Sequence, residues 1–339
     1  MRAESDKTMR LAMIGSYGHT NVVLDSLPGL AEVKLAAAAR YGPEDKLAFV
    51  GRRPAAPKDL PVYDDYRKML DEVRPDVVSV CMPLHRNAEA SIEAARRGIH
   101  VISEKPLATT LSDLAELRKA VGQASIRICA MFPMRATPPF QAVRKLVQEG
   151  RIGEPILAFA QKSYPFGRRD DLYRRRETYG GTIPWVAIHA LEFVSYCVGK
   201  DYARVAAMQS NESLPGYPGC EDNGGILLQF RGGGHAIISF DYLRPKAEGV
   251  LRRHGDERLR VAGSEGIVEV VEEGTRVVLM TPTEVQEVPL PPPRDLFGEL
   301  VASIQGRGEC VVTPDDSFRI TEVALKARQA ADTHQIVSL

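Results

Sequence analysis

Lys105 has the residue type and the position for chemistry at a cofactor site. It lies in the triplet Glu104-Lys105-Pro106, directly after the apolar run His100–Ser103, which is typical of a buried parallel strand. Its side chain would then stand at the carboxyl edge of a parallel sheet, where open α/β sheets bind ligands. An ammonium group there could contact both a nicotinamide ring and a substrate hydroxyl.

A second candidate group is His189, in the segment from Gly180 to Glu192. Thr182 is the predicted N-cap of a helix here, and Pro184 suits the first turn. This helix is apolar apart from His189 and Glu192, which are three residues apart and share one face. A neutral imidazole near pH 7 could take the proton from a substrate hydroxyl as hydride leaves its carbon. A histidine in an apolar helix is more often a core residue, but its place after Gly-Gly favours the acid/base role.

The first third of the chain predicts the elements that position Lys105, because short apolar runs alternate there with helical patterns. Strands are expected at Leu11–Ile14, Val33–Ala39, Pro61–Tyr63, Asp76–Met82, His100–Ser103 and Arg127–Phe132. Helices are expected at Thr20–Leu27, Asp64–Val73 with Asp64 as its cap, Asn87–Arg97, and Leu111–Val121 closed by Gly122. Six strands with intervening helices predict a doubly wound parallel sheet.

The pattern changes after about residue 133. Further strands are expected at Ile156–Tyr164, Arg204–Asn211, Gly225–Phe230, His235–Tyr242, Arg258–Ala262, Ile267–Val271 and Thr275–Met280. Their short, glycine-containing connections predict a large, mainly antiparallel open sheet. Helices are expected near residues 140–148, 183–197, 295–303 and 314–331. We therefore predict an α/β domain over residues 1–133 and an α+β domain over residues 134–339. The last helix is a candidate to pack back on the first domain, and an uncovered sheet face would suit a dimer contact.

The stretch Gly15-Ser16-Tyr17-Gly18-His19-Thr20 has the context of a phosphate-binding loop, because it follows a strand and opens a helix. Backbone N–H groups at a helix N-terminus favour a pyrophosphate anion. Only the first glycine of the G-x-G-x-x-G pattern is in place, and Tyr17 at the second position requires a shift that Gly18 could absorb. An ordinary strand–helix turn is the alternative, but six strand–helix units favour a bound nucleotide.

Arg40 ends the second predicted strand, where an acidic residue commonly binds the ribose 2′-hydroxyl of NAD. An arginine there instead suits the 2′-phosphate of NADP. A solvated arginine at a strand end is the alternative. The sequence predicts NAD or NADP as cofactor, with a preference for NADP.

The composition argues against several kinds of partner. The 44 basic and 44 acidic residues balance, so no long-range field attracts nucleic acid or an anionic membrane. The polar start, Met1–Lys7, lacks the apolar core of a secretory signal, and no uninterrupted apolar stretch of about 18 residues exists. The five cysteines are far apart and form no C-x-x-C pair. Buried reduced thiols, a cytoplasmic location and no bound metal are the expectations.

Several segments carry, in order, a resemblance to one family. Glu104-Lys105-Pro106 matches its E-K-P triplet, Met82–Asn87 is similar to its T-P-N-x-x-H segment, and Gly180–Glu192 is similar to its G-G-x-L-x-D-x-G-x-H-x-x-D helix. Met134–Pro139, Gly150–Gly153 and Ala262–Gly266 resemble its linker helix, its G-x-I-G turn and its G-S-E-G connection. The family is the glucose–fructose oxidoreductase / inositol dehydrogenase / rhizopine-catabolism family (Gfo/Idh/MocA), and the resemblance covers nearly the whole chain.

The resemblance implies a Rossmann domain, a C-terminal α/β domain, NAD(P), and oxidation or reduction of a sugar or cyclic polyol. It implies Lys105 and His189 as catalytic groups. The family's Asp on the later helix is Trp185 here, which cannot accept a proton but can stack on a sugar or a nicotinamide. Asn87 and Met82 replace the family's His and Thr. Glu192 is predicted either to orient His189 or to be a buried structural acceptor.

The predicted site also includes residues that bind cofactor and substrate. Contacts to the cofactor are predicted for Gly15, Ser16, Tyr17, Gly18, His19, Arg40, Met82, Pro83, Asn87, Glu104 and Lys105. Contacts to the substrate are predicted for Arg135, Tyr164, Trp185 and Glu192. A basic run, Arg168-Arg169 and Arg174–Arg176, is most often a solvated face or a subunit contact, and the alternative is a clamp for a substrate carboxylate or phosphate.

Two functions remain open at this point. The first is a cytoplasmic NAD(P)-dependent oxidoreductase that acts on a sugar-like polyol and forms a homodimer or homotetramer through the second sheet. The second is a dinucleotide-binding protein with lost or redirected catalysis, acting as a sensor or partner subunit. Tyr17, Arg40 and Trp185 together motivate the second function.

Overall fold

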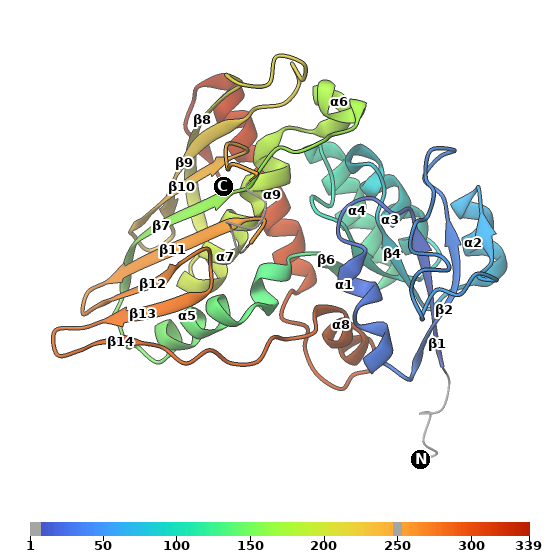
Figure 1. Ribbon diagram of the computed structural model, residues 1–339, viewed down its shortest axis with the longest axis horizontal. Helices are drawn as coiled ribbons and strands as arrows, with labels where there is room; N and C mark the ends of the chain where they lie inside the picture. Colours follow the sequence, from blue (N-terminus) through green and yellow to red (C-terminus); the bar gives the residue numbers. More distant parts are fainter. Residues whose placement is uncertain (1–7, 247–252) are drawn as a thin grey trace. The chain divides into compact units, whose positions relative to one another are not determined.

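The computed structural model describes residues 8–246 and 253–339, which form two compact units (Figure 1). The first unit comprises Met1–Met131 and Asp295–Phe318, and the second comprises Phe132–Arg294 and Arg319–Leu339. The division falls inside α9 (Pro314–Thr333). The start of the chain, Met1–Lys7, which carries the argument against a secretory signal, lies outside the described residues.

The first unit contains the predicted parallel sheet. Its strands are β1 (Met9–Ile14), β2 (Val33–Ala39), β3 (Val62–Tyr63), β4 (Val77–Val80), β5 (His100–Ser103) and β6 (Ile128–Ala130). They lie in the order β3-β2-β1-β4-β5-β6, and every neighbouring pair is parallel. The central strands are buried and apolar because helices cover both faces of such a sheet. The strand order reverses between β1 and β4, which is where a crevice for a ligand forms at the carboxyl edge.

The helices of the first unit are α1 (Asn21–Leu24), α2 (Tyr66–Val73), α3 (Asn87–Ala95), α4 (Leu111–Ala124) and α8 (Leu296–Ile304). The predicted cap of α2 was wrong, because Asp65, and not Asp64, accepts a hydrogen bond from the backbone N–H of Arg67 at 2.9 Å. The predicted end of α4 was also wrong. The helix continues through Gly122, because one glycine costs only about 1 kcal/mol relative to alanine. It ends at Ser125, which takes the left-handed conformation with φ of 54°.

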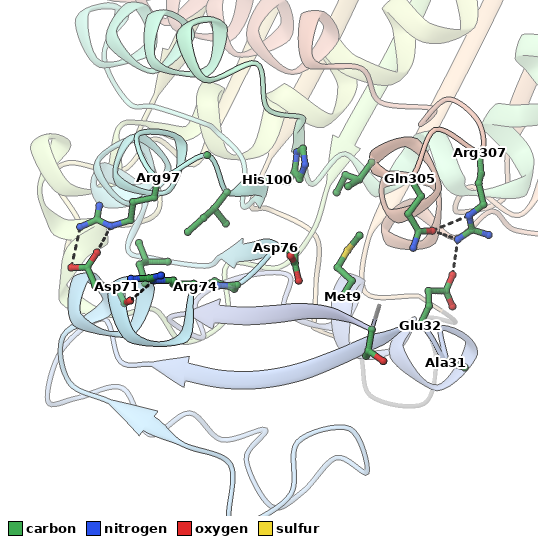
Figure 2. A pocket seen from close by; sticks show the side chains of 16 residues that line it. Met9, Ala31, Glu32, Asp71, Arg74, Asp76, Arg97, His100, Gln305 and Arg307 are labelled. Carbon is green, nitrogen blue, oxygen red and sulfur yellow. Dashed lines mark hydrogen bonds and ion pairs between the residues drawn. The ribbon is translucent and has the colours of Figure 1, made fainter. Parts of the chain in front are cut away.

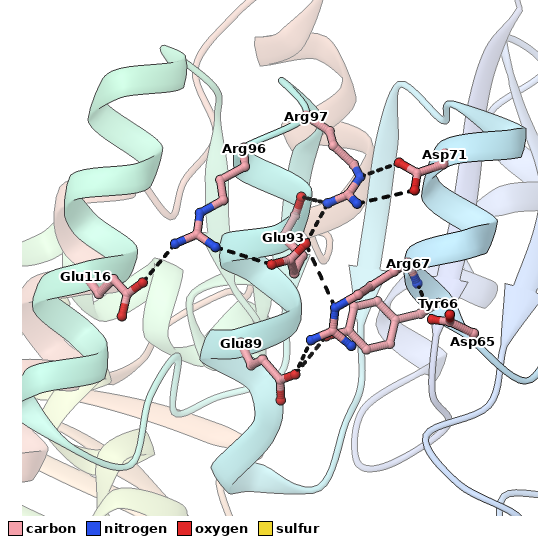
Figure 3. Close-up of polar contacts among 9 residues, drawn as sticks. All are labelled: Asp65, Tyr66, Arg67, Asp71, Glu89, Glu93, Arg96, Arg97 and Glu116. Atoms are coloured by element: carbon pink, nitrogen blue, oxygen red, sulfur yellow. Dashed lines mark hydrogen bonds and ion pairs between the residues drawn. The ribbon is translucent and has the colours of Figure 1, made fainter.

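Ion pairs join α2, α3 and α4 on the surface of the first unit (Figure 3). Arg97 reaches Asp71 of α2 and Glu93 of α3, each at 2.7 Å. Arg96 joins Glu93 to Glu116 of α4, the latter at 3.0 Å. Exposed pairs of this kind each contribute about 0–1 kcal/mol, so the network adds modestly to a fold that apolar burial stabilises.

The second unit is built on a nine-stranded sheet. Its strands are β7 (Pro155–Ser163), β8 (Tyr202–Ser210), β9 (Asn223–Phe230), β10 (His235–Asp241), β11 (Asp256–Gly263), β12 (Ile267–Val271), β13 (Arg276–Met280), β14 (Val285–Glu287) and β15 (Val337–Ser338). They lie in the order β14-β13-β12-β11-β7-β10-β9-β8-β15, and only β7 and β10 pair in parallel. The mainly antiparallel sheet is thus confirmed. The edge strands β14 and β15 were not predicted, because two or three residues give no readable periodicity.

Helices cover one face of this sheet (Figure 1). They are α5 (Pro138–Gln148), α7 (Ile188–Val198) and the second half of α9, and a short helix, α6 (Arg176–Tyr179), precedes α7. The rings of Phe140 and Phe193 stack at 4.3 Å and join α5 to α7. Within the described residues, 176–198 is the one helical stretch long and apolar enough to cross a membrane, and 94% of its apolar window is buried, as in a core helix.

Candidate functional site

The glycine-rich loop closes over the crevice between β1 and β4. The N–H of Gly15 donates to the carbonyl of Ala39 at the end of β2, and the N–H of Tyr17 donates to the carbonyl of Cys81 after β4, both at 2.8 Å. Gly15 has φ of 79°, and a Cβ on it would lie 2.3 Å from the Cys81 carbonyl oxygen. Glycine is required here because the loop crosses the ends of three strands at contact distance.

His19 binds the carboxylate that precedes Lys105, and Gly18 packs against it. The Oε2 atom of Glu104 accepts a hydrogen bond from the backbone N–H of His19, and both carboxylate oxygens lie within 3.0 Å of the His19 Nδ1. The Oε1 atom also accepts the N–H of Lys105 at 2.9 Å. Gly18 has φ of 75°, and a Cβ there would lie 2.1 Å from Oε2. The loop and the E-K-P triplet are therefore one bonded structure.

Glu104 is fully buried, and its charge is stabilised locally. Burial alone would raise the pKa of its carboxyl, but the charge and hydrogen bonds of His19 and the charge of Lys105 lower that pKa overall. Glu104 is thus an anion at neutral pH. The stability that it contributes is present above its unfolded pKa and is lost as the pH falls through the lowered folded value.

The loop fits a dinucleotide through its amides. Among the described residues, no acceptor receives the backbone N–H groups of Ser16, Gly18 or Thr20. These alternate amides can donate to an anion such as a pyrophosphate, while the N–H groups of Tyr17 and His19 between them hold the loop in place. The predicted helix after the loop is shorter than expected, since α1 is one turn long, and its dipole adds little. The ring of Tyr17 lies at 6.4 Å from the ring of Tyr41, beyond β2, so the bulky residue at the second glycine position is turned aside.

The segment after β2 contains Arg40 and a carboxylate that the sequence did not reveal. The Nη1 atom of Arg40 donates to the carbonyl of Asp45 at 2.6 Å, and its Nε lies 3.3 Å from Asp64, whose side chain is 94% exposed. The buried Asp45 carboxylate accepts the Ser16 hydroxyl and the N–H of Leu47. Asp45 lies six residues beyond the end of β2, and no local sequence signal marks its link to the loop, because Ser16 is 29 residues away.

Asn87 joins two strand ends and is fully buried. Its amide nitrogen donates to the carbonyls of Glu104 and Pro106, both at 3.3 Å, and its oxygen accepts the N–H of Met82 at 3.2 Å. The side chain therefore positions the chain after β4 and β5. Met82 and Pro83 are buried beside it, and the side chain of Lys105 is only 1% exposed.

In the second unit, Trp185 and His189 lie on a helix with an irregular first turn. Residues Ile183–Ala187 form a single π-helical turn that leads into α7, with Pro184 in the first turn as predicted. Such turns recur at functional sites because the extra residue re-aims neighbouring side chains. Trp185 and His189 are both buried, at 6% and 4% exposure.

Thr182 occupies the predicted N-cap position, but its side chain bonds elsewhere. Its hydroxyl donates to the carbonyl of Glu221 at 2.6 Å, and its N–H donates to the Oε2 atom of Glu221 at 2.9 Å. The side chain of Thr182 caps no helical N–H. The carboxylate that accepts a backbone N–H at the start of this helix thus belongs to Glu221, which is distant in sequence. Local residue spacing does not predict such a contact.

Glu192 and Arg135 form a buried ion pair. The Nε atom of Arg135 donates to the Oε1 atom of Glu192, and their side chains are 5% and 0% exposed. The guanidinium also lies 4.9 Å from the ring of Tyr196. The pair fixes the helix of His189 against residues 133–136. Two roles were predicted for Glu192, and the ion pair with Arg135 corresponds to the role of a buried structural acceptor.

Tyr164, also predicted to contact substrate, lies at the end of β7. It is buried, its ring meets that of Tyr242 edge-on at 5.1 Å, and the Nζ atom of Lys162 lies 5.2 Å from its centroid. Each unit thus gathers one group of predicted residues. The first holds the loop, Asn87, Glu104 and Lys105, and the second holds Arg135, Tyr164, Trp185, His189 and Glu192. Convergence of Lys105 and His189 on one substrate stays a prediction.

A large pocket of about 1420 Å³ lies at the opposite edge of the parallel sheet (Figure 2). Met9, Asp76 and His100 line it where β1, β4 and β5 begin. Two of its three arginines have carboxylate partners: Arg97 pairs with Asp71, and Arg307 pairs with Glu32 at 2.6 Å. Open α/β sheets bind ligands at the other edge, so this pocket is not the candidate site. Within the described chain, no group of three or more His, Cys, Asp or Glu residues could hold a metal ion.

Replacing Gly18 by alanine is expected to weaken NAD(P) binding at least tenfold. The added Cβ meets the anchored Glu104 carboxylate, and a left-handed residue other than glycine costs about 1–2 kcal/mol. The dissociation constant from quenching of nicotinamide fluorescence measures the effect. Gly98→Ala is the matched control, because Gly98 has φ of 70° but an added Cβ would have nothing within 4 Å. Wild-type affinity in Gly18→Ala would contradict the role of the contact.

Known proteins agree with this fold and loop. Residues 9–131 match the family profile "Oxidoreductase family, NAD-binding Rossmann fold", and residues 140–269 match "GFO/IDH/MocA C-terminal domain". A solved structure from Thermotoga maritima, assigned as an oxidoreductase, is 36% identical, covers 98% of this chain and 100% of its own, and has a TM-score of 0.91.

Two curated relatives have named activities. The 1,5-anhydro-D-fructose reductase of Ensifer adhaerens is 29% identical over 277 residues, which cover 78% of this chain and 80% of the relative. The inositol 2-dehydrogenase of Rhizobium meliloti is 27% identical over 263 residues, covering 77% and 75%. The match to a third relative, an oxidoreductase of Bacillus subtilis, covers 60% of this chain and only 58% of that relative's length. With both family profiles matched in order, and with the loop of Gly15 and Gly18 bonded to the E-K-P triplet, this chain belongs to the Gfo/Idh/MocA family of NAD-binding oxidoreductases.

Proposed function

We propose that this chain transfers hydride between the nicotinamide of NAD(P) and a hydroxyl-bearing or carbonyl carbon of a sugar or cyclic polyol. The observation that carries the proposal is the bonded unit of the phosphate loop, Glu104 and the backbone of Lys105, since it fixes the residue that carries the ammonium group to the cofactor loop. The two relatives that act on anhydrofructose and inositol support the substrate class.

In this reaction the residues of the chain would have separate roles in cofactor binding, proton transfer and substrate binding. The amides of Ser16, Gly18 and Thr20 bind the pyrophosphate, and the bound nicotinamide supplies the hydride acceptor or donor. Lys105 stabilises the alkoxide, and His189 holds or returns the hydroxyl proton as general acid/base. Trp185 takes the place of the family's carboxylate and offers a stacking face to the sugar. The buried ion pair of Glu192 keeps the helix of His189 in position.

Turnover on a panel of polyols tests the proposal. Purified protein is mixed with NAD⁺ or NADP⁺ and with inositols, aldoses, anhydrosugars or their oxidation products, and nicotinamide absorbance is followed. Hydride exchange with at least one polyol is expected. Tight cofactor binding without turnover across the panel would instead support a cofactor-binding sensor. The relatives with named activities are enzymes, which favours the oxidoreductase.

NADP is the cofactor that Arg40 favours. Its guanidinium lies after β2 with one exposed carboxylate beside it, and a 2′-phosphate can replace that exposed partner. Arg40→Ser is expected to lower the affinity for NADP⁺ about 10- to 100-fold and to change NAD⁺ affinity little, because one charge-assisted contact is lost. Isothermal titration measures both constants, with the exposed Arg52→Ser as control. Equal losses for the two cofactors would contradict the assignment.

The uncovered face of the nine-stranded sheet supports assembly into a homodimer or homotetramer. Phe159, Ile237, Leu227 and Ala206 are register partners on neighbouring strands and form one row across that face. The first three are 40% to 49% exposed, and Met208 nearby is 76% exposed. Apolar patches of this kind mark contact surfaces. Sedimentation velocity at micromolar concentration tests this, and a monomer would refute it.

Five free, buried cysteines support a cytoplasmic location. Cell fractionation tests this location, and recovery of the protein in an extracytoplasmic fraction would refute it.

A further inference from the structure

The guanidinium of Arg169 lies among aromatic rings of the second unit. Its Cζ atom is 5.2 to 5.8 Å from the centroids of four rings, those of Tyr164, Phe166, Tyr173 and Tyr242. Distances within about 6 Å are those of cation–π contacts. Among the described residues, none accepts a hydrogen bond from this side chain or forms an ion pair with it, and its Nε atom is buried without an acceptor.

Three other cations in this part of the unit have carboxylate partners. Lys162 pairs with Glu257, Arg176 pairs with Glu221, and Arg244 lies 3.5 Å from Asp256 and 2.9 Å from Glu273. Within the part of the chain that the structure describes, aromatic rings take the place of a carboxylate beside Arg169. A partly desolvated donor left without an acceptor is unfavourable, so its position is better explained by a ligand than by the fold alone.

The chemistry of a guanidinium surrounded by rings indicates which ligand it would bind. Aromatic rings contact the flat faces of a guanidinium, whereas its N–H groups point outward in its own plane. Those N–H groups match the paired oxygens of a carboxylate or a phosphate, which arginine binds in bidentate fashion. A neutral hydroxyl would use one donor and leave the charge uncompensated.

The ring cluster is bonded to the start of the helix that carries Trp185 and His189. The hydroxyl of Tyr179 lies 2.8 Å from that of Tyr242 and donates to Thr182 at 3.1 Å. Thr182 directly precedes the π-helical turn. Arg169 is therefore attached, through two tyrosines, to the element that holds the predicted acid/base.

We infer that Arg169 binds an anionic oxygen group of the substrate, so that the preferred substrate is a sugar or polyol bearing a carboxylate or a phosphate. The inference rests on the proposed function and narrows its substrate class from neutral to acidic sugars. Arg169 determines specificity, and it takes no part in hydride transfer.

Three probes with one ring separate the possibilities: D-glucose, D-glucuronate and D-glucose 6-phosphate differ only at C6. Binding to the cofactor-loaded protein is measured by isothermal titration, and turnover by nicotinamide absorbance. The protein is expected to bind one anion at least tenfold more tightly than glucose. Arg169→Met is expected to lower that affinity about 10- to 100-fold without changing affinity for glucose. Arg169→Lys keeps the positive charge but loses the paired N–H donors of the guanidinium, so its affinity for the anion should lie between those of the wild type and Arg169→Met.

Arg168→Met is the matched control, because Arg168 is exposed and makes the same change of charge one residue away. It is expected to behave as wild type. Preference for glucuronate identifies a carboxylate, and preference for the 6-phosphate identifies a phosphate. Equal binding of the three probes, no binding of any, or an anion preference that survives in Arg169→Met would overturn the inference. Anion binding that depends on Arg169 but gives no turnover with any sugar would count against the proposed function and leave the subsite standing.

Discussion

Replacing Lys105 by methionine is expected to lower kcat by about 10²–10⁴-fold, the usual contribution of a well-placed acid–base or alkoxide-stabilising group. Methionine keeps the length and apolar stem of a side chain that is only 1% exposed, and it removes the ammonium. Cofactor binding should change little, because Glu104 remains anchored to His19. His189→Ala is expected to cause a loss of similar size.

The double variant Lys105→Met/His189→Ala shows whether the two residues act together on one substrate hydroxyl or independently of each other. If Lys105 and His189 act on the same reacting hydroxyl, their effects are not additive, and the double variant loses less than the product of the two single losses. Steady-state kinetics on the best polyol measure this, and circular dichroism checks the fold. Lys119→Met, an exposed change on α4, is the control. Wild-type turnover in either single variant would remove that residue from the mechanism.

Replacing Glu192 by leucine is expected to destabilise the second unit by about 3–5 kcal/mol. The change leaves the Arg135 guanidinium buried without its anion, and an uncompensated buried charge is that costly. Arg135→Met should destabilise by a similar amount. The double variant Arg135→Met/Glu192→Leu should recover most of the loss, because an apolar pair of similar volume is often as stable as the ion pair.

Trp185 makes this measurement specific to the second unit. It is the only tryptophan in the chain and lies on the helix of Glu192. Urea unfolding followed by its fluorescence therefore reports on this region. Glu149→Gln, which removes the partner of Lys145 in an exposed pair, is the control and should cost less than 1 kcal/mol. A loss below 1 kcal/mol in Glu192→Leu would show that the pair contributes little.

Much of the fold was readable from local pattern. The bounds of β2 and β5 agree with the apolar runs, because the strands of a parallel sheet covered on both faces are mostly apolar. The bounds of β12 agree as well, although its burial alternates along the strand. The start of α8 was also predicted, since Asp295 caps it through the N–H of Gly298 at 3.0 Å. Helix ends were less predictable. At α4, the left-handed residue is Ser125 and not the nearby glycine.

The site was readable in its residues but not in its contacts. The loop at Gly15 and the triplet at Lys105 were recognised from sequence, whereas the bond between Glu104 and His19 joins residues 85 positions apart. Asp45 and Glu221 were missed for the same reason, because their partners Ser16 and Thr182 are 29 and 39 residues away and such contacts have no local pattern. The ion pair of Arg135 with Glu192 spans 57 residues and was equally invisible.

The close approach of Gly18 to Glu104 limits how the cofactor preference of this enzyme can be redesigned. A side chain at position 18 and a long acid at position 104 cannot coexist, so these two positions can change only together. Redesign toward either nicotinamide cofactor is therefore better confined to residues 40–44, since the buried Asp45 is bonded to Ser16 of the phosphate loop.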